Sequence, residues 1–191
     1  PLPPKVQKPG CVGLPAGPEI KIFLPDGTEA ATGSIGEVCI RGDNVTPGYE
    51  NNAKANAESF TNGWFHTGDQ GVLDGDGYLK ITGRLKEIIN RGGEKVSPLE
   101  VDDVLMDHPA VQQVVTFAVP HKMLGEDVAA AVVLADGAAV TEKELQTYAS
   151  EKLAPFKVPK TFVFLEEIPK GDTGKMQRIG LAEKLGLGGD Q

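Results

Sequence analysis

The sequence predicts an α+β protein in which a β-rich part precedes a smaller α/β part. Up to about residue 83, short segments of alternating apolar and polar residues are separated by Gly- and Pro-rich turns. After residue 83, helical patterns alternate with apolar strands. The 191 residues are 40% hydrophobic and 24% charged, which is typical of a folded domain and excludes a disordered or collagen-like chain.

The first part is expected to consist mainly of hairpins. Residues 19–24 and 35–40 alternate as half-buried strands should, and residues 53–60 form the one helix. Residues 71–73 and 78–81 read as a second hairpin around the sequence DGDG at 74–77. The same letters resemble a calcium loop, but the twelfth position holds Leu85 instead of the bidentate Glu, so we interpret the segment as a turn.

The second part is expected to begin after residue 85, which divides the chain into 1–85 and 86–191. Ser97-Pro98-Leu99-Glu100 reads as a capping box with Pro at the first helical position, and the helix should end at His108-Pro109. A second helix should start at residues 141–144 and a last one should cover 177–185. The expected strands are residues 111–119, 128–134 and 161–165.

Composition and termini limit the partners and the location. A net charge of -8 gives no bulk attraction for nucleic acid, and no apolar run approaches the roughly 20 residues that span a bilayer. Cys11 and Cys39 lack a CxxC spacing, so we interpret them as packed thiols in a reducing compartment and expect no metal site. The chain starts without Met or a signal peptide and ends without a peroxisomal signal, so we expect a piece of a longer, cytoplasmic protein.

The sequence GWFHTGD at residues 63–69 ends in a carboxylate that a small turn would display. The two oxygens of Asp69 can accept hydrogen bonds from vicinal ribose hydroxyls. Arg84, in the segment that joins the two parts, can add a donor fork to the same sugar. Alternatively, Asp69 only caps a turn and residues 83–95 form a solvated basic linker with a turn before the next helix. His66 is a weaker candidate for a catalytic base.

Two Gly-containing loops complete the set of candidates. Gly92 and Gly93 would let the backbone approach an elongated ligand closely. Residues 168–175 form a loop that ends in Lys175, whose ammonium can neutralise charge at an α-phosphate. This loop is not a Walker loop, because its glycines are too close together and Met176 replaces Ser or Thr. The alternative is a flexible surface loop before the last helix.

The three clusters, in this order, resemble the C-terminal third of the adenylate-forming acyl-CoA synthetases, the AMP-binding enzymes. The residues that carry this resemblance are 10–15, 36–42, 48–49, 67–69, 83–84, 92–93, 169–170 and 174–175. Residues 63–69, 89–98 and 156–160 look most like the plant-type oxalate-CoA ligases, close to the 4-coumarate-CoA ligase-like enzymes.

The resemblance implies that residues 1–85 end a large N-terminal adenylation domain and that 86–191 form a mobile lid. It implies an ATP-dependent acid-thiol ligase that forms an acyl-adenylate and then transfers the acyl group to CoA. Asp69, Arg84 and Lys175 would bind ATP or AMP, with Lys175 catalytic in the first step, and Lys86 would be the hinge. Gly92 and Gly93 would bind CoA. The acid is expected to be oxalate.

The resemblance also implies parts that residues 1–191 lack, namely the phosphate loop and the motif that binds adenine and Mg²⁺. We therefore expect this chain to be inactive alone, with the Mg²⁺ ligands upstream, and we expect no nucleic-acid or membrane partner. Two alternatives stay open: an adenylation domain that loads a carrier protein, or a non-catalytic interaction module.

Overall fold

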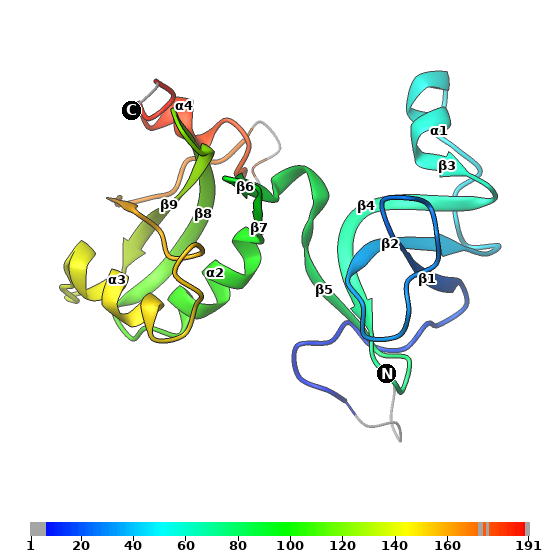
Figure 1. The fold of residues 1–191 in the computed structure, drawn as a ribbon, viewed down its shortest axis with the longest axis horizontal. Helices are drawn as coiled ribbons and strands as arrows, with labels where there is room; N and C mark the ends of the chain where they lie inside the picture. Colours follow the sequence, from blue (N-terminus) through cyan, green and yellow to red (C-terminus); the bar gives the residue numbers. More distant parts are fainter. Residues whose placement is uncertain (1–6, 172–173, 175, 190–191) are drawn as a thin grey trace. The chain divides into compact units, whose positions relative to one another are not determined.

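The computed structural model describes residues 7–171, 174 and 176–189, and it separates into two compact units (Figure 1). These units are Pro1–Lys86 and Glu87–Gln191, a division one residue later than the one expected from sequence. Within the described residues, each unit is built around one five-stranded sheet, so the α+β class with a β-rich first part is confirmed. The two units are described separately below.

The first unit is an antiparallel sheet with one short helix. The sheet order is β1-β2-β4-β3, and β5 also pairs with β4. The helix α1 is Ala53–Ser59, and the strands are β1 Glu19–Phe23, β2 Gly36–Arg41, β3 Phe60–Thr61, β4 Trp64–Leu73 and β5 Leu79–Arg84. The core on one face contains Ile22, Val38 and Leu79, which are at most 5% exposed. Both predicted hairpins are confirmed.

Two facing glycines let β2 and β4 approach their neighbours closely. Gly36 and Gly71 are register partners in the β2–β4 pair. A Cβ on Gly36 would lie 2.4 Å from the Phe23 carbonyl oxygen, and one on Gly71 would lie 2.8 Å from the Lys80 carbonyl oxygen. Since neither backbone oxygen can move cheaply, a larger residue at either position would push the strands apart.

The second unit is a mixed sheet with helices on both faces. The sheet order is β10-β9-β6-β7 with β8 also on β9, and only the β10–β9 pair is parallel among these strands. The 3-10 turn η1, Leu85–Glu87, leads into it. The elements are β6 Ile89–Arg91, β7 Glu94–Val96, α2 Pro98–Met106, β8 Val111–His121, β9 Gly125–Leu134, α3 Glu142–Ser150, β10 Thr161–Phe164 and α4 Leu181–Lys184.

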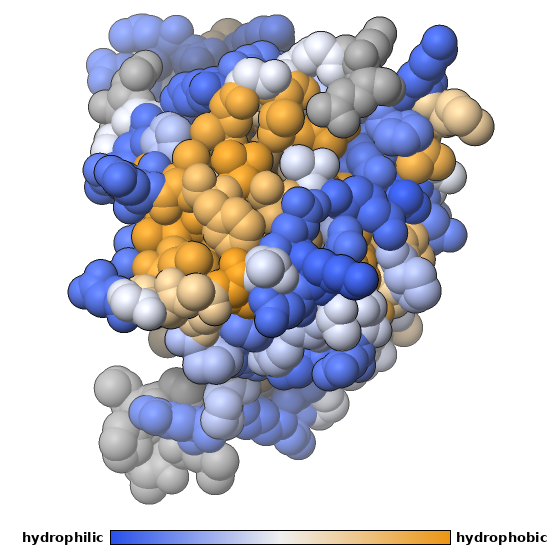
Figure 2. All heavy atoms as spheres, turned by 90° about the vertical axis from the view of Figure 1, so that its left-hand side faces the viewer, coloured by the Kyte–Doolittle hydropathy of each residue, from blue (hydrophilic) through white to orange (hydrophobic). Residues whose placement is uncertain are grey.

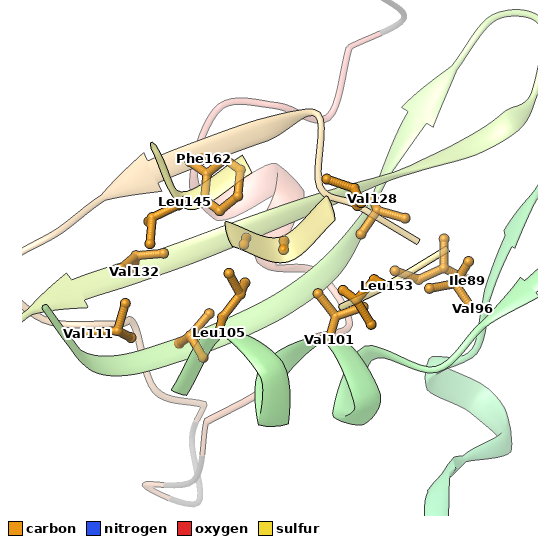
Figure 3. Packing of buried hydrophobic residues seen from close by; sticks show 14 residues of the cluster. Ile89, Val96, Val101, Leu105, Val111, Val128, Val132, Leu145, Leu153 and Phe162 are labelled. Atoms are coloured by element: carbon orange, nitrogen blue, oxygen red, sulfur yellow. The ribbon is translucent and has the colours of Figure 1, made fainter. Parts of the chain in front are cut away.

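Strand β9 is buried on both faces, which explains its continuous apolar sequence. Val128 and Val132 point into the core that α2 and α3 cover (Figure 3), and Ala130 belongs to the same core. The alternate residues Ala129, Ala131 and Val133 face the core that α4 covers. Figure 3 shows Leu105 of α2 within the first core, where it is fully buried. Truncating such a side chain to Ala costs about 2–5 kcal/mol of stability.

Two local expectations are wrong. The last helix is only α4, because Gly180 adopts a left-handed φ of 78° immediately before it and so interrupts residues 177–185. The capping box at residues 97–100 does not form: Ser97 is the N-cap without a side-chain capping hydrogen bond. Both carboxylate oxygens of Glu100 instead accept hydrogen bonds from Lys157 Nζ at 2.7 Å. The capping box that starts α3, between Thr141 and Glu144, is confirmed.

The surface view in Figure 2 shows hydrophobic residues gathered in one area and bordered by hydrophilic ones. In the second unit, Phe164 on the edge strand β10 is 41% exposed and Met123 is 87% exposed. No helix in the described part of the chain is long and apolar enough to cross a membrane.

Candidate functional site

Asp69 lies within strand β4, not on a free turn as expected from sequence. Gly68 beside it has a left-handed φ of 74°, and the pairing with β5 shifts register between Gln70 and Gly71. These two irregularities bend an otherwise regular strand at the candidate carboxylate. A bulge of this kind re-aims a side chain without ending the strand.

Two side chains fasten this bend to strand β2. The hydroxyl of Thr67 donates to the Val38 carbonyl oxygen at 2.7 Å and accepts from the Asp69 backbone N–H at 3.1 Å. Glu37 Oε1 accepts from the Gly68 backbone N–H at 3.1 Å. Sequence reasoning missed Glu37 and Thr67 as supports of Asp69, because their role depends on the register between β2 and β4.

The structure brings Asp69 and Arg84 together, as the sequence predicted. They are direct register partners in the β4–β5 pair, and Arg84 Nε lies 3.5 Å from Asp69 Oδ1. The Asp69 side chain is 36% exposed and that of Arg84 57%, so both remain accessible to a ligand. A carboxylate acceptor beside a guanidinium donor is an arrangement suited to a sugar diol.

The first unit also contains a pocket of about 440 Å³. Its walls include Trp64, His66, Glu37 and Gln70 together with apolar residues of the β1 end. Asp69 and Arg84 do not line it. The pocket and the carboxylate–guanidinium pair are therefore two separate features, and we base the nucleotide site on the pair.

Lys86, the expected hinge, is an exposed residue of η1, and the residue after it is anchored inside the second unit. Arg178 Nε donates to Glu87 Oε2 at 2.9 Å, while Arg178 Nη1 lies 2.7 Å from Asp102 Oδ2. The same Nη1 donates to the Thr116 carbonyl oxygen at 3.1 Å. Burial raises the pKa of the Asp102 carboxyl, and the Arg178 guanidinium opposes that rise.

Lys175 lies outside the described residues. The base of its loop is described: residues Lys170 and Met176 form an antiparallel bridge, and Gly174 N–H donates to the Gly171 carbonyl oxygen at 2.9 Å. The Gln177 side chain, which is exposed, packs over Gly171. Lys170 itself is paired with Glu167 at 2.7 Å.

Gly92 and Gly93 form the turn between β6 and β7, a hairpin that the sequence analysis did not predict. Their φ values are 58° and 94°, as expected for a two-residue hairpin turn. Gly92 N–H donates to the Leu124 carbonyl oxygen at 2.9 Å. The turn alone thus explains both glycines, and both remain exposed.

Residues 100–175 match the family model described as AMP-binding enzyme C-terminal domain. The chain is 50% identical to an oxalate-CoA ligase of Arabidopsis thaliana over 177 residues, which are 93% of this chain and 34% of that protein. It is 48% identical to the oxalate-CoA ligase of Saccharomyces cerevisiae over 184 residues, 95% of this chain and again 34% of the relative. The chain thus spans about a third of the length of these curated relatives.

Solved structures give the same relationship. ATP-bound MatB from Rhodopseudomonas palustris matches with a TM-score of 0.87 and 34% identity, over 95% of this chain and 37% of that one. The o-succinylbenzoate CoA synthetase of Bacillus subtilis, in complex with its acyl-adenylate intermediate, matches with a TM-score of 0.82 and 38% identity, over 88% of this chain and 34% of that one. The chain belongs to the adenylate-forming, AMP-binding acyl-CoA synthetase superfamily, whose C-terminal portion it contains.

Proposed function

We propose that the protein carrying this chain is an ATP-dependent acid-CoA ligase and that its acid is oxalate. The acid carboxylate attacks the α-phosphate of ATP, so that a C–O–P link forms as pyrophosphate leaves. The CoA thiolate then attacks the acyl carbon and AMP leaves. The relatives named oxalate-CoA ligase support the substrate, at 50% and 48% identity.

The observation that carries the proposal is the register pairing of Asp69 with Arg84. In the proposed site, the Asp69 carboxylate accepts hydrogen bonds from the ribose 2′- and 3′-hydroxyls, and Arg84 donates to the same sugar. Thr67 and Glu37 fix the bend that presents Asp69. Preorganised supports of this kind let a ligand bind without first ordering the Asp69 side chain.

In the second unit, we propose that Lys175 neutralises charge on the carboxylate and α-phosphate during adenylation only. Rotation about Lys86 would then withdraw Lys175 and bring Gly92 and Gly93 to the pantetheine arm of CoA. We also propose that Mg²⁺ binds together with ATP, and that its ligands lie in parts of the full-length protein outside residues 1–191. Isolated thiols such as Cys11 support a reducing, cytoplasmic location.

The test separates the two half-reactions in the full-length natural protein. Lys175→Ala should abolish pyrophosphate exchange into ATP with oxalate, yet leave thioester formation from supplied oxalyl-adenylate intact. Lys170→Ala is the matched control, since Lys170 lies in the same loop and is paired with Glu167. It should leave both half-reactions at wild-type rates. Equal loss of both half-reactions in Lys175→Ala would contradict the assigned step.

A companion experiment tests acceptor and acid. CoA should support product formation, and a carrier-protein phosphopantetheine should not. A preference for the carrier protein would replace the ligase proposal by carrier loading. The isolated 191-residue chain should catalyse no pyrophosphate exchange, because it spans about a third of the relatives' length. Exchange by this chain would contradict that expectation.

A further inference from the structure

We propose that Glu37, Cys39 and His66 form a binding site for a borderline-soft divalent cation of the Zn²⁺ type, with its fourth coordination position open to the pocket of the first unit. Among the described residues, these three are the group of His, Cys, Asp or Glu side chains whose candidate ligand atoms converge. Those atoms all lie within 4.8 Å of one another. The proposal does not depend on the ligase activity.

The sheet register assembles the three ligands. Cys39 of β2 and His66 of β4 are direct Cα partners, and Cys39 Sγ lies 3.3 Å from His66 Nδ1. Glu37 Oε2 lies 2.8 Å from the same Nδ1. The β2–β4 register shifts between Glu37 and Cys39, and such a bulge turns a side chain from its regular direction. Carboxylate, thiol and imidazole therefore converge from two adjacent strands.

The two separations that involve His66 Nδ1 are close to those of a tetrahedral zinc centre, and the Glu37 and Cys39 ligand atoms lie within 4.8 Å of each other. With Zn–S of about 2.3 Å and Zn–N of about 2.0 Å, tetrahedral ligands place S and N about 3.5 Å apart. Two ligands at about 2.0 Å lie about 3.3 Å from each other. The distances of 3.3 Å and 2.8 Å therefore require the side chains to open by only a few tenths of an ångström. The backbone can keep its register.

One nitrogen faces two groups, and a hydrogen bond satisfies only one of them. His66 Nδ1 can donate its single proton to Glu37 Oε2 or accept one from the Cys39 thiol, but it cannot do both. A cation in the middle would bind all three ligand atoms at once. Glu37 Oε1 would keep its hydrogen bond with the Gly68 N–H, because metal binding uses the other oxygen.

The pocket gives access to the site. Glu37 and His66 line the pocket of about 440 Å³, whereas Cys39 does not line it and is 0% exposed. Three protein ligands and a fourth position that a water can occupy is the pattern of an open zinc site. Burial raises the pKa of the Cys39 thiol to about 12, so a metal must displace the thiol proton when it binds.

The experiment titrates the metal-free 191-residue chain with Zn²⁺ against a chromophoric chelator, and with Co²⁺ for its absorption spectrum. We expect one equivalent of Zn²⁺ per chain, release of the Cys39 proton into the buffer, and a thiolate-to-Co²⁺ charge-transfer band. Cys39→Ala should abolish that band and weaken Zn²⁺ binding at least tenfold. Cys11→Ala, which removes the other free thiol, should change neither.

Because Cys39 is fully buried, Glu37→Gln is a second variant that keeps the shape of the side chain. It should retain the charge-transfer band but weaken Zn²⁺ binding about tenfold or more, with an unchanged far-UV circular dichroism spectrum. The proposal is overturned if the folded wild-type chain binds no Zn²⁺. It is equally overturned if Cys39→Ala binds Zn²⁺ as the wild type does, or if Cys11→Ala removes the band.

Discussion

Arg178→Ala should destabilise the second unit strongly, and the loss should depend on pH. The guanidinium is the cation next to a carboxylate, Asp102, whose side chain is only 11% exposed. Removing one partner of a buried ion pair costs about 3–5 kcal/mol, since it leaves the other charge uncompensated. In the variant, Asp102 would still accept a hydrogen bond from the Thr116 backbone N–H, which is 2.7 Å long in the wild type. This hydrogen bond would hold the carboxylate in its buried position.

Protonation of Asp102 sets an upper limit on the stability that Arg178→Ala can remove. An unfolded Asp has a pKa of about 3.9, so holding it neutral at pH 7 costs about 4 kcal/mol, and at pH 5 about 1.5 kcal/mol. In the variant, burial raises the Asp102 pKa without opposition from Arg178. A raised folded-state pKa means that stability is present at acidic pH and lost as pH rises. The destabilisation should therefore be about 3–4 kcal/mol at pH 7 and smaller by about 2 kcal/mol at pH 5.

The assay is unfolding in urea at pH 5 and pH 7, monitored by hydrogen exchange of the β8 amides. Trp64, the single tryptophan, lies in β4 of the first unit, so its fluorescence transition is an internal control that should not shift. Adding Asp102→Asn to Arg178→Ala should remove the pH-dependent part of the destabilisation. A loss below about 1 kcal/mol at pH 7, or an equal loss at both pH values, would refute the reasoning.

Glu37→Gln in the full-length protein should raise the KM for ATP about fivefold with little change in kcat, because it weakens one charge-assisted hydrogen bond to the Asp69 bend; steady-state kinetics would contradict this if only kcat fell. Gly71→Ala should cost about 1–3 kcal/mol, measured by Trp64 fluorescence in urea, since its Cβ would lie 2.7 Å from Val38 Cγ2; an unchanged midpoint would show that the strands can separate freely. Glu144→Gln should flatten the loss of stability in acid below about pH 4, measured by circular dichroism. Hydrogen bonds from the N-cap backbone and hydroxyl lower the Glu144 pKa, so its contribution is present at neutral pH and disappears as pH falls; the same acid slope in both proteins would contradict this.

Sequence patterns predicted the strands that are apolar over their whole length and the hairpins with strong turn signals. Strand β9 was identifiable because both of its faces are buried, which makes the run apolar without interruption. The hairpin of β6 and β7 was not found, because each strand has three residues and its sequence is mostly polar. Only pairing with β9, at Arg91 and Gly125, places that hairpin in the sheet.

The capping signals show the same limit. The two candidate boxes, at 97–100 and 141–144, have equivalent sequences, yet only the second forms. Glu100 is taken by Lys157, which is 57 residues away in the chain, so a distant ion pair replaces the local hydrogen bond. A local pattern can state which bonds are available, but tertiary partners decide which of them form.

For the candidate site, the sequence suggested that Asp69 and Arg84 contact the same ribose, and the strand pairing places the two residues opposite each other. The supports of Asp69 escaped notice, since Glu37 and Thr67 act through a register that no local pattern encodes. The cluster of Glu37, Cys39 and His66 escaped for the same reason. The sequence shows Glu37 and Cys39 in one strand, but it does not show that His66 of the neighbouring strand lies beside them.

The Arg178 contacts also bear on where a proposed hinge can bend. Glu87 is the first residue of the second unit, and its carboxylate is fixed to Arg178, which is fixed in turn to Asp102 and to the Thr116 backbone. A rotation after Glu87 would have to break this partly buried network. The torsion change proposed for the lid would therefore occur at exposed Lys86 or before it, and the ion network that stabilises the second unit would set where that movement begins.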